Sequence, residues 1–175
     1  MKFMNEPSGS NPNPGYHYPQ HPNYPPPPPP PPPGRGMIKV TGILLIIFGG
    51  LGIFGAIAVL SLLWAVPEVG DIIKDEFGPA VITYMFYALI VTAIYLAFGI
   101  IGMNNAGKAA KAQIVVNMGI ILIALQAIDF IIQITFPEVR FDSELPSVIV
   151  GALIGLVLPV LYVVGGNMNK NSLKS

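Results

Sequence analysis

The sequence predicts an all-α membrane protein, a bundle of four transmembrane helices behind a disordered, proline-rich N-terminal tail. Of its 175 residues, 53 % are apolar and only 10 % are charged, whereas soluble domains carry about 25 % charged residues. Such a chain cannot cover a water-exposed surface with polar groups. The apolar residues fall in four long blocks, and 14 of the 19 prolines precede them. We therefore expect a tail at 1–36, a membrane domain at 37–166 and a short tail at 167–175.

The N-terminal tail contains no Ala, Val, Ile or Leu. It cannot bury enough apolar surface to offset the entropy of ordering, so disorder is expected. Nine consecutive prolines, Pro25 to Pro33, predict a stiff polyproline II rod of about 28 Å at roughly 3.1 Å per residue. Polyproline is a preformed ligand for aromatic grooves, which makes Tyr24, Pro25 and Pro33 candidate contacts for a cytoplasmic polyproline-binding protein. The alternative is that the run is only a spacer.

The four apolar blocks match the length of a bilayer. A helix needs about 20 residues to cross the hydrocarbon core, and the predicted spans are 38–66, 80–103, 114–136 and 144–165. The fourth span is expected to begin with a cap at Ser143-Glu144 and to stop at Gly165-Gly166. The segment 67–79 is expected to be an external loop, in which Ile72, Ile73 and Phe77 could share one face of a short interfacial helix.

Basic residues predict the orientation in the membrane. Seven lie in the N-terminal tail, the second loop and the C-terminal tail, and two lie in the first and third loops. The seven are Lys2, Arg35, Lys39, Lys108, Lys111, Lys170 and Lys174, and the two are Lys74 and Arg140. Because loops rich in Lys and Arg stay in the cytoplasm, both termini are expected there, in a multi-pass protein of the cell membrane.

Small residues predict where the helices pack closely, since lipid supplies little hydrophobic drive between helices. Gly49 and Gly52 lie near one stripe of the first span. The fourth span contains a GxxxG motif at Gly151 and Gly155. We expect these glycines to pack within the bundle, and homo-oligomerisation through the motif is the alternative.

The third span carries an internal carboxyl group. Gln126, Asp129 and Gln133 lie within about 60° of one another on a helix. A charge in a span costs about 2.5–3.5 kcal/mol on insertion scales, so Asp129 should face the bundle interior. Counting from the outer ends of the spans places Tyr87 at the depth of Asp129, with Tyr84 on the same face. The cluster is either an ion or proton site, or a structural contact in which protonated Asp129 bonds to a neighbour.

The sequence predicts no conventional catalytic or metal site. It has no cysteine, and its two histidines, His17 and His21, both lie in the tail. The usual nucleophile activators and transition-metal ligands are therefore missing from the spans. We expect no enzymatic activity, no metal, no cofactor and no nucleic-acid partner.

Two segments carry a resemblance to a group of known proteins. One is the glycine-rich start of the first span, Gly42-Ile43-Leu44-Leu45-Ile46-Ile47-Phe48-Gly49-Gly50-Leu51-Gly52. The other is the turn Gly99-Ile100-Ile101-Gly102-Met103-Asn104-Asn105-Ala106-Gly107-Lys108. Residues 38–166 resemble small, uncharacterised four-span membrane proteins of Gram-positive bacteria that carry a low-complexity cytoplasmic head. The resemblance implies a fold and a membrane location, and it supplies no catalytic residue.

The expected function is that of a non-enzymatic adaptor or scaffold. In this interpretation four helices anchor the proline-rich tail in the bilayer, and a cytoplasmic protein binds the tail. The alternative is a small oligomeric transporter or channel subunit that uses Asp129.

Overall fold

The computed structural model describes residues 30–139 and 145–173, and all of the secondary structure in these ranges is helical. The elements are α1 (Arg35–Ala65), α2 (Pro67–Asn105), the 3-10 turn η1 (Ala109–Lys111), α3 (Ala112–Thr135), the 3-10 turn η2 (Pro137–Val139) and α4 (Leu145–Asn171). Four of these helices are long and apolar enough to cross a membrane. The predicted four-span helical fold is confirmed. The predicted tail up to Pro29 lies outside the described residues.

A turn leads the chain into α1. The amide of Arg35 donates to the carbonyl of Pro32 at 3.2 Å, and Gly34 has φ 89° and ψ −15°. Proline at the second position, glycine with positive φ at the third and this hydrogen bond define a type II turn. A Cβ on Gly34 would also lie 3.0 Å from the Cβ of Met168 in α4. Gly34 is therefore required both for its conformation and for the close approach of α4.

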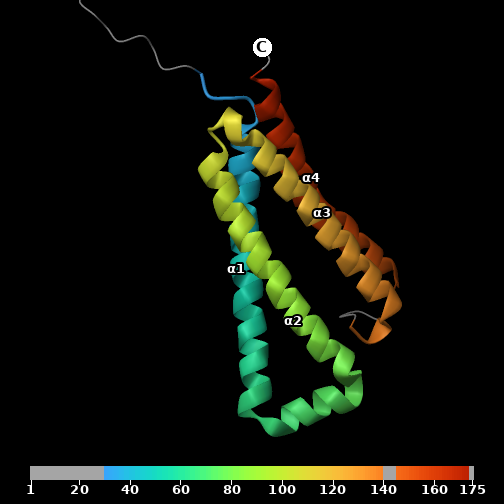
Figure 1. The fold of residues 1–175 in the computed structure, drawn as a ribbon. Coiled ribbons are helices and arrows are strands. Elements are labelled where there is room, and N and C mark those ends of the chain that lie inside the picture. Colours follow the sequence, from blue (N-terminus) through green and yellow to red (C-terminus); the bar gives the residue numbers. More distant parts are fainter. Residues whose placement is uncertain (1–29, 140–144, 174–175) are drawn as a thin grey trace, which may run out of the picture. The chain divides into compact units, whose positions relative to one another are not determined.

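The segment 67–79, predicted as an external segment that could hold a short interfacial helix, is helical throughout. α2 begins at Pro67, one residue after α1 ends, because proline is preformed for the first helical position. The helix then continues through Pro79 to Asn105. In Figure 1 the start of α2 runs across the end of α1 before the helix turns and follows its main course. A proline inside a helix removes a backbone hydrogen bond and permits such a bend. The part of α2 that is apolar enough to cross a membrane runs from Ala80 to Asn105.

The predicted end of the fourth span is also wrong. α4 continues past Gly165 and Gly166 to Asn171. Both glycines are buried in contacts with other helices: an added Cβ would lie 3.0 Å from Ile38 Cγ1 at Gly165 and 2.8 Å from Val116 Cγ2 at Gly166. They serve close packing, and the helix does not end there.

The helices pack as two hairpins. α1 packs mainly along α2 and α3 along α4, and the two hairpins meet where α1 contacts α4 and where α2 contacts α3 and η2. Figure 1 shows the two hairpins close together near the C-terminus. The buried apolar cluster lies in the closely packed half and comprises Ile38, Leu45, Ala106, Val115, Met118, Leu122 and Tyr162.

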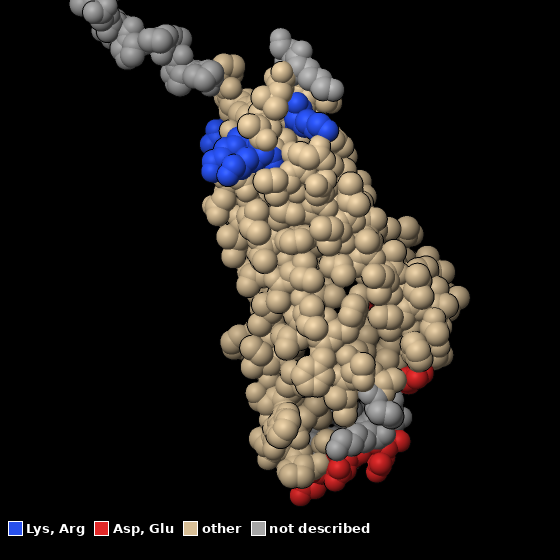
Figure 2. Space-filling view, viewed as in Figure 1, with Lys and Arg blue, Asp and Glu red and all other residues tan. Residues whose placement is uncertain are grey.

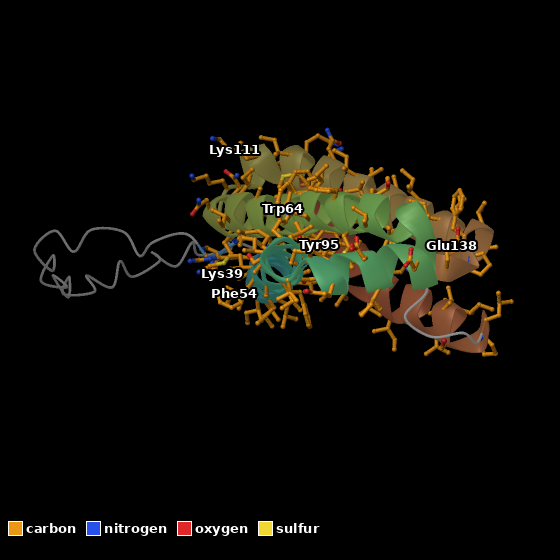
Figure 3. All side chains as sticks on the ribbon, turned by 90° about the horizontal axis from the view of Figure 1, so that it is seen from below. Lys39, Phe54, Trp64, Tyr95, Lys111 and Glu138 are labelled. Carbon is orange, nitrogen blue, oxygen red and sulfur yellow. The ribbon has the colours of Figure 1, made fainter. Side chains whose placement is uncertain are left out.

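The remaining surface of the helices is largely apolar. Phe54 and Trp64 on α1 are 79 % and 86 % exposed, and Figure 3, seen from below, shows Phe54 on the outer side of α1. Side chains of this kind are stable on a helix surface only where hydrocarbon replaces water. Trp64 lies one residue from the end of α1, as expected for an aromatic residue at the membrane interface.

Candidate functional site

The intramembrane carboxyl group is held by two neutral donors. The hydroxyl of Tyr84 in α2 donates to Oδ1 of Asp129 at 2.8 Å, and Nε2 of Gln133 donates to Oδ2 at 2.7 Å. Gln133 Nε2 also lies 3.4 Å from the Tyr84 hydroxyl. Gln133 reaches Asp129 because residues four apart share one helix face. The structure thus brings together three of the five residues predicted to form the cluster.

The other two predicted residues lie nearby but do not contact the carboxyl group. Tyr87 donates to the backbone carbonyl of Leu125 at 3.2 Å, and its ring lies 5.9 Å from that of Tyr84. Gln126 accepts at Oε1 from Tyr95 at 3.2 Å. Counting along the spans placed Tyr87 at the depth of Asp129, whereas its hydroxyl reaches the carbonyl of Leu125, which lies about one turn along α3 from Asp129.

Two further tyrosines, which were not predicted to belong to the cluster, also form hydrogen bonds between α2 and other helices. Tyr95 lies among the helices in Figure 3 and bonds to α3 through Gln126. Tyr162 in α4 is fully buried and donates to the carbonyl of Phe98 at 2.7 Å. Tyr95 shares the helix face of Tyr84 and Tyr87, and this spacing could have predicted that it belongs to the polar cluster. Four tyrosine hydroxyls therefore connect α2 to α3 and α4.

The carboxyl group lines one cavity, and a second cavity shares lining residues with it. The first, of about 330 Å³, lies between α3 and α4 and is lined by Gln126, Asp129, Gln133, Ser147, Val148, Gly151 and Ala152. The second, of about 460 Å³, is lined by Phe48, Tyr95, Gln126, Gly151, Ile154, Gly155, Val157 and Leu158. Gln126 and Gly151 line both cavities. The first is therefore bounded by polar groups of α3, and the second is mainly apolar.

Three of the four predicted packing glycines lie at helix contacts. A Cβ on Gly49 would lie 2.6 Å from the Leu96 amide nitrogen, and one on Gly155 would lie 2.8 Å from Gln126 Cδ. Gly52 faces Thr92, whose Cβ would lie 3.0 Å away. Gly151 differs, because no atom lies within 4 Å of its Cβ position. The prediction that Gly151 packs against a neighbouring helix of the bundle is wrong, because it borders the cavities instead.

The residues predicted to bind a polyproline reader are only partly described. Tyr24 and Pro25 lie outside the described residues. Pro33 is exposed and belongs to the type II turn before α1. A polyproline rod can therefore extend no further than Pro33, since the turn redirects the chain at Gly34.

Charge separates along the helices. Figure 2 shows the Lys and Arg side chains gathered at one end of the bundle and most of the Asp and Glu side chains at the other. The described basic residues near the helix ends on that side are Arg35, Lys39, Lys108, Lys111 and Lys170. Within the described ranges, no group of three or more His, Asp or Glu side chains is placed to hold a metal ion.

Comparison of the chain with protein-family models, with curated proteins and with solved structures gives no match.

Proposed function

We propose that this protein is a non-enzymatic membrane adaptor, which presents its proline-rich tail to a cytoplasmic polyproline-binding protein. The observation that carries the proposal is the type II turn at Pro32–Arg35, which connects the proline run directly to α1. No flexible linker separates the last prolines from the first helix. A ligand segment attached in this way is held within a few nanometres of the bilayer, because nine prolines extend only about 28 Å.

The proposed orientation places both termini in the cytoplasm of a cell whose plasma membrane contains the four spans. It is supported by the seven-to-two distribution of basic residues and by the basic end of the bundle in Figure 2. The chain has no cysteine, so single cysteines can be introduced without further change. Asp75→Cys should react with an impermeant maleimide in intact cells, and Ala110→Cys should react only after lysis. The reverse labelling would invert the orientation.

Binding to the tail can be tested with the full chain in lipid nanodiscs. The parent is compared with a variant in which Pro25–Pro33 are replaced by nine alternating Gly and Ser residues, which preserves the length of a spacer. The probes are purified SH3 and WW domains from the cytoplasm of the same cell, measured by surface plasmon resonance. The adaptor role predicts binding of at least one probe to the parent and at least tenfold weaker binding to the variant. Equal binding to both chains, or binding to neither, would assign the prolines a spacer role.

A second candidate function, an oligomeric transporter or channel subunit, is favoured by one observation. Asp129, Gln126 and Gln133 line a cavity of about 330 Å³ between α3 and α4. An ionisable group beside a cavity in a span is typical of ion and proton pathways. Proton or sodium flux into liposomes should then disappear in Asp129→Asn. Flux at the rate of protein-free liposomes for the parent would remove this candidate.

A further inference from the structure

The two cavities beside α3 together have the chemistry of an amphiphile site. One presents the carboxyl group of Asp129, and the other is bounded by Phe48, Ile154, Val157 and Leu158. Because Gln126 and Gly151 line both, the polar and apolar parts adjoin. We propose that they form one binding site for a lipophilic amine, with the cationic head beside Asp129 and the hydrocarbon body in the apolar cavity. This goes beyond the adaptor role and requires no transport.

The described residues that line the cavity of Asp129 include no Lys, Arg or His. The sequence contains no Lys, Arg or His at 75–107, 112–139 or 145–169. The hydrogen bonds of Asp129 come from the Tyr84 hydroxyl and the Gln133 amide, both uncharged. Each carboxylate oxygen can accept more than one hydrogen bond. An ammonium group that enters the first cavity would therefore supply both the missing charge and further donors.

The apolar cavity opens toward the lipid. Phe48 and Ile154, which line this cavity, are 53 % and 67 % exposed. On a membrane-spanning helix such exposed apolar side chains face hydrocarbon, so a ligand dissolved in the bilayer reaches the cavity laterally. The two cavities, of about 330 and 460 Å³, each fall within the range of small-molecule sites, about 300–1,000 Å³.

Charge selects the kind of amphiphile. A fatty acid would bring a second carboxylate beside Asp129. Two like charges placed side by side repel strongly in a medium of low dielectric constant. An alcohol would gain a hydrogen bond but no charge pairing. Of the three amphiphiles, the amine is the one whose head complements Asp129.

Gly151 offers a way to block the site. It borders both cavities, and nothing lies within 4 Å of its Cβ position. A leucine there can occupy the cavity without displacing a neighbouring helix. Gly50 on α1 is the matched control, because its Cβ position is equally open and it does not line either cavity.

The test measures binding of radiolabelled N,N-dimethyldodecylamine to the full chain in lipid nanodiscs, with protein-free nanodiscs subtracted. We expect saturable binding of one amine per chain by the parent and by Gly50→Leu. Affinity should fall at least tenfold in Asp129→Asn, and binding should be lost in Gly151→Leu. Unlabelled dodecanol and dodecanoate should compete at least tenfold less well than the amine.

Three results would overturn the proposal. They are the absence of saturable binding by the parent, parent-like affinity in either Asp129→Asn or folded Gly151→Leu, and equal competition by dodecanoate. Circular dichroism of each variant shows whether the helices are intact. If Gly151→Leu does not fold, Asp129→Asn, which keeps the shape of the side chain, decides the question alone. Failure of the SH3 and WW binding experiment would leave this result unaffected, because the tail takes no part in it.

Discussion

Replacing Gly49 with alanine should separate α1 from α2. The added Cβ would lie 2.6 Å from the Leu96 amide nitrogen, 2.9 Å from the Thr92 carbonyl oxygen and 3.0 Å from Leu96 Cα. All three are backbone atoms, so no side-chain rotation relieves the overlap. Ordinary contact begins at 3.4 Å, so the two helices must move apart by about 0.8 Å.

The size of the effect follows from this displacement. A gap of about 0.5–1 Å forfeits a quarter to a half of each dispersion contact around it, and overpacking a close interface typically costs about 1–3 kcal/mol. Gly50, the next residue, has no atom within 4 Å of its Cβ position. Gly50→Ala should be neutral or stabilise by up to about 1 kcal/mol, since alanine favours the helix. The two neighbouring substitutions should therefore have opposite signs or differ by at least about 1 kcal/mol.

Unfolding in mixed micelles measures the difference. The purified protein is titrated with SDS while its loss of helical structure is followed by circular dichroism, and refolding establishes reversibility. Gly49→Ala should unfold at a lower SDS fraction than the parent, and Gly50→Ala at an equal or higher one. Equal midpoints for the two variants would refute the close backbone contact between α1 and α2.

The remaining predictions concern the hydroxyl contacts of α2. Tyr162→Phe should lower the free energy of unfolding in SDS by about 0.6–1.7 kcal/mol, because a buried interhelical hydrogen bond of that worth is lost; an unchanged midpoint would show that the bond contributes nothing. Asp129→Asn should leave the α-helical circular dichroism spectrum unchanged, since asparagine keeps the shape and an acceptor for Tyr84. A double-mutant cycle of Asp129→Asn with Tyr84→Phe should give a coupling of about 0.6 kcal/mol, and additive effects would exclude a contribution from that contact.

The number and type of helices could be predicted because the bilayer imposes a length on apolar segments. The bends and ends of the helices could not. The Gly165-Gly166 pair is typical of a helix boundary, yet α4 runs through it. The two glycines lie against Ile38 of α1 and Val116 of α3, and such contacts cannot be derived from the sequence of α4.

The composition of the polar cluster was easier to predict than its pairings. A stripe on one helix is fixed by the 3.6-residue repeat, so Gln133 and Asp129 could be placed together. Which tyrosine of α2 meets Asp129 depends on the tilt and rotation of α2 relative to α3, and neither follows from residue counts. The GxxxG motif likewise does not predict that the space beside Gly151 is empty, because this depends on how α4 is oriented against its neighbours.

The uneven packing of the two hairpins gives the bundle a mechanical asymmetry. The buried cluster around Leu45 and Tyr162 lies in one half, whereas the cavity lined by Asp129 lies nearer the other end of α3. A helix of 27 residues such as α4 is about 40 Å long. A rotation of about 5° at the closely packed end would therefore move the far end by about 3.5 Å, roughly two helical residues of rise. A small rotation at the closely packed end is thereby converted into an ångström-scale displacement of α4 beside the cavity lined by Asp129.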